Sequence, residues 1–204
     1  FSSNRFLSRQ AAVMLVRKAI GNVAGQIKCF EKSVKFPSFA QNVYREICRF
    51  KSALVSPGRL EELSREAFGE VAARLKDIAL IYGEYERLLE GRYTDTQGLL
   101  KLMAEGAQGS EYIKNCHFYV AGYDEFSRAE YGCVKSIASA CRGICFALAE
   151  DGQLLSEIRQ MAGELGAKLA VKGVPSRRKT SRELIYRHID DYGYRGGSIC
   201  PDIK

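Results

Sequence analysis

Hydrophobic residues recur every three or four positions through the first half of the chain, which is the spacing of side chains that share one face of a helix. Ser8 is suited to cap the first of these helices, Ser38 a second, and Pro57 the first turn of a short third. Gly91 is suited to end a fourth helix and Gly106 a fifth. The apolar stripes of the first, second, fourth and fifth predicted helices are, in order, Ala12, Leu15, Val16, Ala19 and Ile20; Phe39, Val43, Ile47, Phe50 and Leu54; Val71, Leu75, Ile78, Tyr82, Tyr85 and Leu89; and Leu99, Leu102 and Met103.

The pattern changes after Ser110, where short apolar runs bounded by turn residues predict strands. Between the first two runs, Ser127 and Glu130 have the spacing of a capping box, which predicts a helix that runs to about Ala140. Strands that alternate with helices are typical of a parallel sheet. The predicted strands cover residues 116–121, 143–149 and 168–171, and a further helix covers residues 154–165.

The fold class that follows is mainly α with an α/β part. We expect a helical subdomain over residues 1–110, part of a parallel-sheet domain over 111–190, and an extended or disordered tail over 191–204, which is rich in Gly and Tyr. A hydrophobic fraction of 46% in 204 residues is enough for a core and excludes a generally disordered chain. The sequence contains no run of about 20 apolar residues, so we expect no membrane partner.

The chain begins at Phe1 without a signal-peptide pattern, and we expect it to be a segment cut from a longer protein. Its seven cysteines include no C-x-x-C pair, so their spacing gives no support to a zinc site. Scattered cysteines in odd number are typical of reduced thiols in a cytoplasmic protein.

Positive charge is concentrated at the start of the chain. Residues 1–59 carry 11 basic and 2 acidic side chains, whereas residues 60–130 carry 8 basic and 14 acidic ones. A local excess of this size attracts polyanions and indicates a nucleic acid as partner. The alternative is a solvated face whose charges are neutralised by the acidic middle segment packed beside it.

Five basic residues and no acidic ones fall within residues 172–182, just ahead of a predicted helix. This segment is a candidate for binding phosphates, and an ordinary solvated loop is an equal alternative. Arg9, Arg17 and Lys18 offer another basic surface in the first helix. The candidate nucleic-acid-binding residues of the segment are Lys172, Arg177, Arg178, Lys179 and Arg182.

The sequence lacks the residues that an ATP-driven motor needs. No G-x-x-x-x-G-K-[ST] loop occurs, and the strand that ends at Ala121 and is followed by Gly122 carries no carboxylate at its end. Asp124 and Glu125 come later, where acidic residues are also favoured by the N-terminus of the next helix. His117 and His188 have no partner at a catalytic spacing. We therefore assign no catalytic residue and no metal ligand.

Three motifs in order resemble the B subunit of the two-subunit ATP-dependent helicase–nuclease, the AddB or RexB type. Residues 74–82, R-L-K-D-I-A-L-I-Y, resemble the family's K-L-x-D-I-x-x-I-Y, and residues 93–95, Y-T-D, resemble its Y-x-D. Residues 118–130, F-Y-V-A-G-Y-D-E-F-S-R-A-E, resemble its h-Y-h-D-G-F-x-x-F-T-x-x-E, where h is hydrophobic. The resemblance runs from about Ser8 to about Ile189.

The resemblance implies a large protein with a degenerate superfamily 1 helicase half and a C-terminal nuclease that carries an iron–sulfur cluster. Such a protein pairs with an A subunit and processes double-strand DNA ends for recombination, with ATP and Mg²⁺ as cofactors of the whole complex. This chain would be the helical insertion and part of the RecA-like first motor domain. The P-loop would precede Phe1 and the cluster cysteines would follow Lys204, so that this segment itself holds no cofactor.

Two departures from the family pattern matter, because the family commonly has Asp at the position of Ala121 and Thr at that of Ser127. The resemblance thus implies a degenerate Walker B-like turn formed by Ala121, Gly122, Asp124 and Glu125. We expect a non-catalytic scaffold that contacts single-stranded DNA or a duplex end in the bacterial cytoplasm, close to the nucleoid. The alternatives are an adaptor that docks the A subunit, and part of an active motor whose P-loop lies upstream.

Overall fold

The structure, a computed structural model, describes residues 5–147 and 153–167. The chain forms two compact units, each made of two segments. One unit consists of Phe1–Phe118 and Phe126–Cys145, and the other of Tyr119–Glu125 and Phe146–Lys204. The predicted strand over 168–171, the basic segment over 172–182 and the predicted tail lie outside the described residues.

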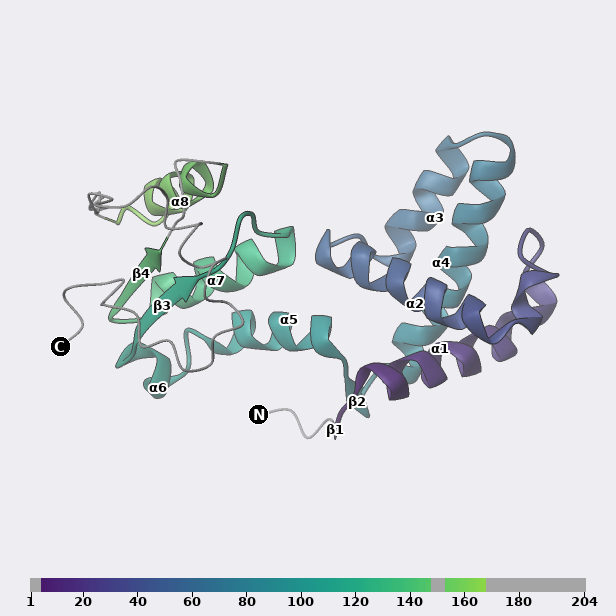
Figure 1. Ribbon diagram of the computed structural model, residues 1–204, viewed down its shortest axis with the longest axis horizontal. Coiled ribbons are helices and arrows are strands. Elements are labelled where there is room, and N and C mark those ends of the chain that lie inside the picture. The colour runs from purple at the N-terminus through teal and green to yellow at the C-terminus, as the bar shows by residue number, and fades with distance from the viewer. Residues whose placement is uncertain (1–4, 148–152, 168–204) are drawn as a thin grey trace, which may run out of the picture. The chain divides into compact units, whose positions relative to one another are not determined.

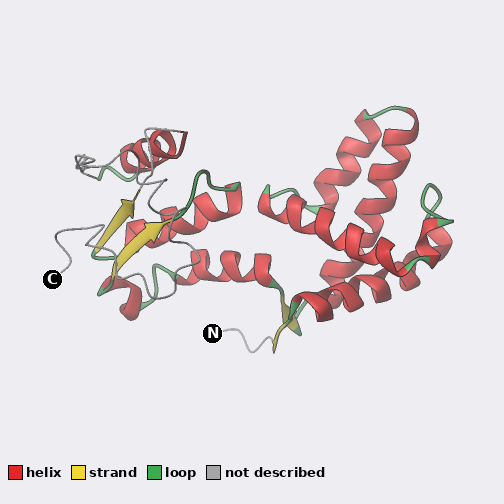
Figure 2. Ribbon diagram, in the orientation of Figure 1, coloured by secondary structure: helices red, strands yellow, loops and turns green. Residues whose placement is uncertain are grey.

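Helices make up most of the described chain, and the few strands are short (Figure 2). This confirms the predicted class, mainly α with an α/β part. The elements are β1 Arg5–Phe6, α1 Arg9–Val23, α2 Pro37–Ser52, α3 Pro57–Glu66, α4 Gly69–Leu89, β2 Tyr93–Thr94, α5 Thr96–Gly106, α6 Glu111–Lys114, β3 His117–Ala121, α7 Arg128–Ala140, β4 Gly143–Ala147 and α8 Gln153–Glu164, with single 3₁₀ turns η1 Ala24–Gln26 and η2 Ser33–Lys35.

Helices α1 to α4 enclose the larger core (Figure 1). Helix α4 packs against both α1 and α3, and α1 also packs against α2. Burying a large apolar side chain contributes about 1.5–3 kcal/mol, so this shared face stabilises helices that would be marginal alone. The predicted stripes supply most of the core, which consists of Ala12, Val16, Ala19, Ile20, Val23, Ile27, Ala40, Val43, Tyr44, Ile47, Leu60, Ala79, Ile81, Tyr82, Tyr85 and Leu89.

Both predicted ends of the second helix are wrong by a few residues. Helix α2 starts at Pro37 with Phe36 as its N-cap, and not with Ser38, because proline lacks an N–H and suits the first helical position. It stops at Ser52, and Leu54, predicted as core, is 66% exposed. Leu54 adopts a left-handed φ of 59°, and the Val55 N–H bonds back to the Phe50 carbonyl, which is the Schellman ending usually made by glycine.

The predicted face of the fifth helix is also wrong. Leu99, Leu102 and Met103 on α5 are 42%, 37% and 42% exposed. The neighbouring face is the buried one, and it packs against α7 in a second, smaller core. That core consists of Ala107, Cys133 and Ile137, with Leu100, Ala104, Ile113, Phe118, Ala140 and Cys141 packed against it.

Two short parallel sheets complete the described fold. β1 pairs with β2, so that Arg5 lies opposite Tyr93 and Phe6 opposite Thr94, a pairing that sequence reasoning missed because two residues show no alternation. β3 pairs with β4 in parallel, joined by α7, as predicted from the strand–helix–strand order. None of the described helices is long and apolar enough to span a bilayer.

Candidate functional site

The family resemblance predicts that the end of β3 corresponds to the position at which an active motor holds its metal ion. Ala121 is the last residue of the strand, and Gly122 follows with a left-handed φ of 80°, a conformation that favours glycine. Asp124 and Glu125 lie exposed on the turn between β3 and α7. Mg²⁺ binds through carboxylate oxygens and water. The side chains of Ala121 and Gly122 do not fit such an ion, and the degenerate Walker B-like role of the four residues stays a prediction.

The next carboxylate along the chain, that of Glu130, forms a hydrogen bond that caps α7. Ser127 Oγ accepts from the Glu130 N–H at 3.3 Å, and Glu130 Oε2 accepts from the Ser127 N–H at 2.9 Å. This is the capping box predicted from the sequence, and it opens α7. His117 lies on β3, where its Nδ1 would be 2.9 Å from a Cβ built on Gly143, so it packs closely against the start of β4.

The cations at the start of the chain are mostly left without acidic partners. Lys51 and Arg59 pair with acids of the 60–130 segment, and Arg49 pairs with Glu46 one turn away. Three acids of α3 and α4, Glu61, Glu70 and Glu84, bond instead to arginines three or four residues along their own helix. Eight cations form no ion pair with any residue in the described ranges: Arg5, Arg9, Arg17, Lys18, Lys28, Lys32, Lys35 and Arg45. Neutralisation by the acidic middle segment is therefore only local.

The predicted basic residues Lys172, Arg177, Arg178, Lys179 and Arg182 lie outside the described residues, as does His188. Arg9, Arg17 and Lys18 are all exposed on α1. The six cysteines within the described part of the chain are free thiols, and Cys145 is the exposed one among them.

A buried carboxylate at Asp95 joins α2, α4 and α5. Asp95 is 1% exposed; it caps α5 by accepting from the Gly98 N–H at 2.7 Å, and it accepts from the Tyr85 hydroxyl at 2.9 Å and from Lys51 Nζ at 2.8 Å. Lys51 also pairs with Glu86 at 2.8 Å. Burial lowers the pKa of Lys51, but the charges of Asp95 and Glu86 outweigh this and raise it. The lysine therefore stays charged inside the protein.

A second buried carboxylate, Asp77 on α4, holds the segment that follows α1. Asp77 is 2% exposed and accepts from three consecutive backbone N–H groups, those of Lys28, Cys29 and Phe30, at 3.2, 2.7 and 3.1 Å. Sequence reasoning noted Asp77 and Asp95 in the matched motifs but gave them no role. For Asp77, the available signal was an acidic residue among the apolar residues of a long helix, because a carboxylate buried in a core requires several donors.

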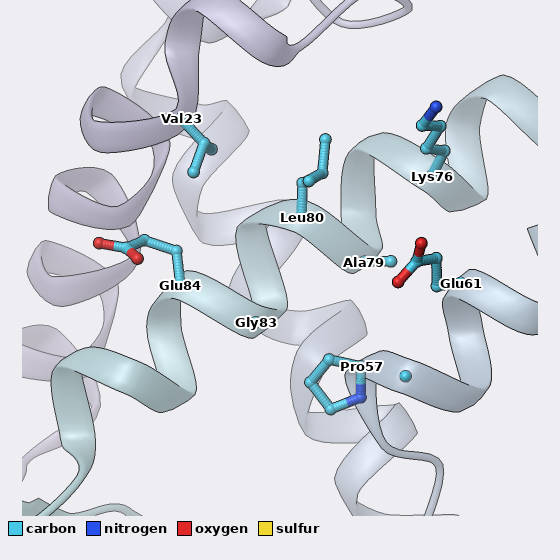
Figure 3. Close-up of a pocket in the computed structure, with 9 residues that line it drawn as sticks. Val23, Pro57, Glu61, Lys76, Ala79, Leu80, Gly83 and Glu84 are labelled. Carbon is cyan, nitrogen blue, oxygen red and sulfur yellow. The ribbon is translucent and has the colours of Figure 1, made fainter.

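A hollow of about 350 Å³ lies where the end of α1 meets α3 and α4 (Figure 3). A Cβ built on Gly83 would lie 3.8 Å from the Cβ of Pro57 across it. Glu84 at its rim is already bonded, because hydrogen bonds from Arg87 and Asn22 lower its pKa to about 2. The hollow therefore offers no unengaged acid–base pair. Its lining residues are Val23, Pro57, Gly58, Glu61, Lys76, Ala79, Leu80, Gly83 and Glu84.

Alkaline pH is expected to destabilise the helical core through its tyrosines. Burial raises the pKa of Tyr44, Tyr82 and Tyr85 above the ordinary value of about 10, and the charge of Asp95 adds to each shift. Unfolded tyrosines ionise near pH 10 while the folded ones stay protonated, so stability is intact below that pH and falls as the pH rises above it. Urea unfolding at several pH values checks this, and Tyr85→Phe should show a shallower decline. An equally steep decline in that variant would contradict the assignment to Tyr85.

Comparison with known proteins gives a match over most of the chain. A family model described as "ADDB, N-terminal" matches residues 2–165. Similar proteins, each named as the B subunit of an ATP-dependent helicase/deoxyribonuclease, include those of Staphylococcus saprophyticus, 27% identical over 80% of this chain, Anoxybacillus flavithermus, 28% over 73%, and Geobacillus kaustophilus, 29% over 68%. The matched part is only 12–15% of the length of these three relatives.

Proposed function

Because this chain belongs to the AddB N-terminal family, we propose that it is the non-catalytic, DNA-contacting part of the B subunit of a helicase–nuclease. The whole complex would use ATP to process double-strand DNA breaks for recombinational repair, and the A subunit would supply the active motor. These activities are carried over from the names of the relatives and from the family resemblance.

The chemistry at the end of β3 supports a scaffold over a motor. An active motor needs a carboxylate beside the nucleotide-bound metal ion. Here the strand ends on the methyl group of Ala121, and the glycine after it occupies a backbone conformation in which a larger residue is strained. Asp124 and Glu125 are exposed on the turn beyond it.

The main support for the DNA-contacting role is the distribution of ion pairs. Eight of the eleven cations in residues 1–59 lack an acidic partner among the described residues, although fourteen acids follow in the next segment. Charges left unpaired on one stretch of chain keep their field in solvent and attract phosphates. A face neutralised by the acidic middle segment would pair more of them.

Docking of the A subunit is the second candidate, and exposed apolar side chains favour it. Phe68 and Val71, where α3 turns into α4, are 91% and 60% exposed, and the outer face of α5 exposes Leu99 and Met103. Exposed apolar groups of this size commonly mark protein interfaces. Capture of the A subunit that is lost in Phe68→Ser but kept in Lys32→Gln would favour this role over DNA contact.

The DNA-contacting role predicts salt-dependent binding of single-stranded DNA by the purified chain. In Lys18→Gln/Lys32→Gln, two unpaired cations are lost, and the slope of log affinity against log salt should fall by about 0.7 for each phosphate contact removed. Arg65→Gln/Lys114→Gln is the matched control, because it removes equal charge from local ion pairs. Fluorescence anisotropy with an oligothymidine measures the slopes. Absence of binding at low salt, or equal slopes for the two variants, would overturn the proposal.

A further inference from the structure

The segment that connects α1 to α2 combines exposed cations with an exposed aromatic ring. Residues 24–36 read A-G-Q-I-K-C-F-E-K-S-V-K-F and contain three lysines and one acid, Glu31. Lys28, Lys32 and Lys35 are exposed, and none of them forms an ion pair within the described part of the chain. Phe36 is 64% exposed and directly follows the third lysine. We refer to residues 24–36 as the α1–α2 connection; Figure 2 draws it as loop with single helical turns.

The α1–α2 connection is held firmly to the core although its charged side chains face solvent. Ile27 is 4% exposed, and Phe30 and Val34 pack against the larger core. The rings of Phe30 and Phe39 lie 5.3 Å apart, which ties the connection to the first turn of α2. A connection of this composition without such anchors would sample many conformations.

The strongest anchor is the buried carboxylate of Asp77. Its two oxygens accept the three consecutive N–H groups of residues 28–30, so the backbone wraps around the carboxylate as it would around a bound anion. Arg74, one turn earlier on α4, also lies close to Cys29, but its charge is paired with Glu70. Asp77 thereby fixes the backbone that carries Lys28 without neutralising the lysine side chains.

Exposed cations beside an exposed aromatic ring are typical of single-strand binding surfaces. Lysines bind the phosphates, and a ring stacks on a base without regard to sequence. A rigid backbone lowers the entropy lost on binding, which raises affinity without any new contact. A flexible lysine-rich loop would bind duplex and single strands through charge alone.

We propose that the α1–α2 connection is a preorganised contact for single-stranded DNA, in which Phe36 stacks on a base. Lys28, Lys32 and Lys35 bind the flanking phosphates, and Asp77 is the positioning residue that holds the backbone in its binding conformation. This inference rests on the proposed function and names the place where it is carried out.

Tryptophan substitution tests the stacking, because the chain contains no tryptophan. In Phe36→Trp the single indole should lose fluorescence on addition of oligothymidine but not of heparin, which carries charge without bases. Phe68→Trp is the control, since Phe68 is even more exposed but lies in the α3–α4 turn, where residues 61–74 carry four acids and two bases. Equal quenching of both variants by oligothymidine, or quenching of Phe36→Trp by heparin, would overturn the stacking role.

Substitution of Asp77 by asparagine tests the positioning role, because the change in charge and the change in backbone geometry are expected to shift the DNA affinity in opposite directions. Asp77→Asn raises the net charge by one, so charge alone predicts equal or tighter DNA binding. Loss of one acceptor oxygen loosens residues 28–30, and we expect about three- to tenfold weaker binding, with faster hydrogen exchange at these three amides. Unchanged or tighter binding by the folded variant would overturn the role of Asp77.

The outcomes separate this inference from the proposed function. If the unsubstituted chain binds oligothymidine with the expected salt dependence but Phe36→Trp is not quenched and Asp77→Asn binds normally, DNA binding stands and the contact lies elsewhere. If the unsubstituted chain does not bind, the proposed function itself fails. Should Asp77→Asn not fold, the result for Phe36→Trp still decides the proposal.

Discussion

Replacement of Asp95 by alanine is expected to lower the free energy of unfolding by about 3–5 kcal/mol, the range for removal of one partner from a buried ion pair. Three donors lose their acceptor at once: the Gly98 N–H, the Tyr85 hydroxyl and the Lys51 ammonium. Lys51 is the costliest, because its side chain is only 12% exposed and would keep its charge with Glu86 as the remaining partner. Urea unfolding followed by circular dichroism measures the change.

The neighbouring carboxylate provides the matched control for this experiment. Glu86 is 39% exposed and contacts the same lysine, so Glu86→Ala should cost about 1 kcal/mol or less. A Cβ at residue 98 would lie 3.1 Å from Asp95 Oδ1, which shows how little space surrounds the carboxylate. If Asp95→Ala and Glu86→Ala proved equally mild, the buried network would not be the joint between α2, α4 and α5 that we describe.

Replacement of Asp77 by alanine should be the next most damaging change, with a loss of about 3 kcal/mol. It leaves three partly buried backbone N–H groups without an acceptor, and each such group costs about 1 kcal/mol or more. Asp77→Asn should cost less, because its carbonyl oxygen still accepts. Thermal and urea unfolding of the chain measure both.

A second acid on the same helix controls for the loss of negative charge. Glu70 bonds to Arg74 in an exposed i,i+4 pair, and Glu70→Ala should change stability by less than about 0.5 kcal/mol. Protection of the Lys28 and Cys29 amides against hydrogen exchange should vanish in Asp77→Ala and persist in Glu70→Ala. Persistent protection without the Asp77 carboxylate would contradict its role as the acceptor.

Local chemistry could be predicted from the sequence where a residue acts on its immediate neighbours. Ser8 caps α1, Pro57 opens α3, and Ser127 with Glu130 opens α7, as predicted, because these features depend only on residues close by in the sequence. The stripe of α4 was predicted for the same reason, although its first predicted residue, Val71, is wrong, because it lies 60% exposed at the start of the helix. Its period is regular over five turns, and the glycine at 91 ends it with a left-handed φ of 66°.

Features that depend on distant partners could not be predicted in this way. The acceptor role of Asp77 requires a backbone segment 47–49 residues away, and that of Asp95 requires Lys51, 44 residues away. Helix α5 carries apolar side chains on two adjoining faces, and only the position of α7 decides which face is buried. The two-residue strands β1 and β2 have no pattern of their own and form because their partners hold them.

In the candidate site, too, local features could be predicted from the sequence, and features that depend on distant residues could not. The strand that ends at Ala121 without a carboxylate was read from the sequence, because strand ends and missing acids are local facts. Which cations of residues 1–59 lack an ion pair could not be predicted, because net charge gives the balance of a segment and does not show which acids lie near which bases. Lys172 and the other four predicted basic residues lie outside the described residues and stay predictions.

The β1–β2 pair closes the chain around the four-helix part. The Arg5 N–H bonds to the Arg92 carbonyl at 3.0 Å and the Leu7 N–H to the Thr94 carbonyl at 2.9 Å, so the polypeptide enters and leaves this bundle side by side. An element whose two ends meet can grow, shrink or be exchanged without displacing the chain on either side of it. Evolution can therefore rebuild these four helices while the rest of the molecule keeps its geometry.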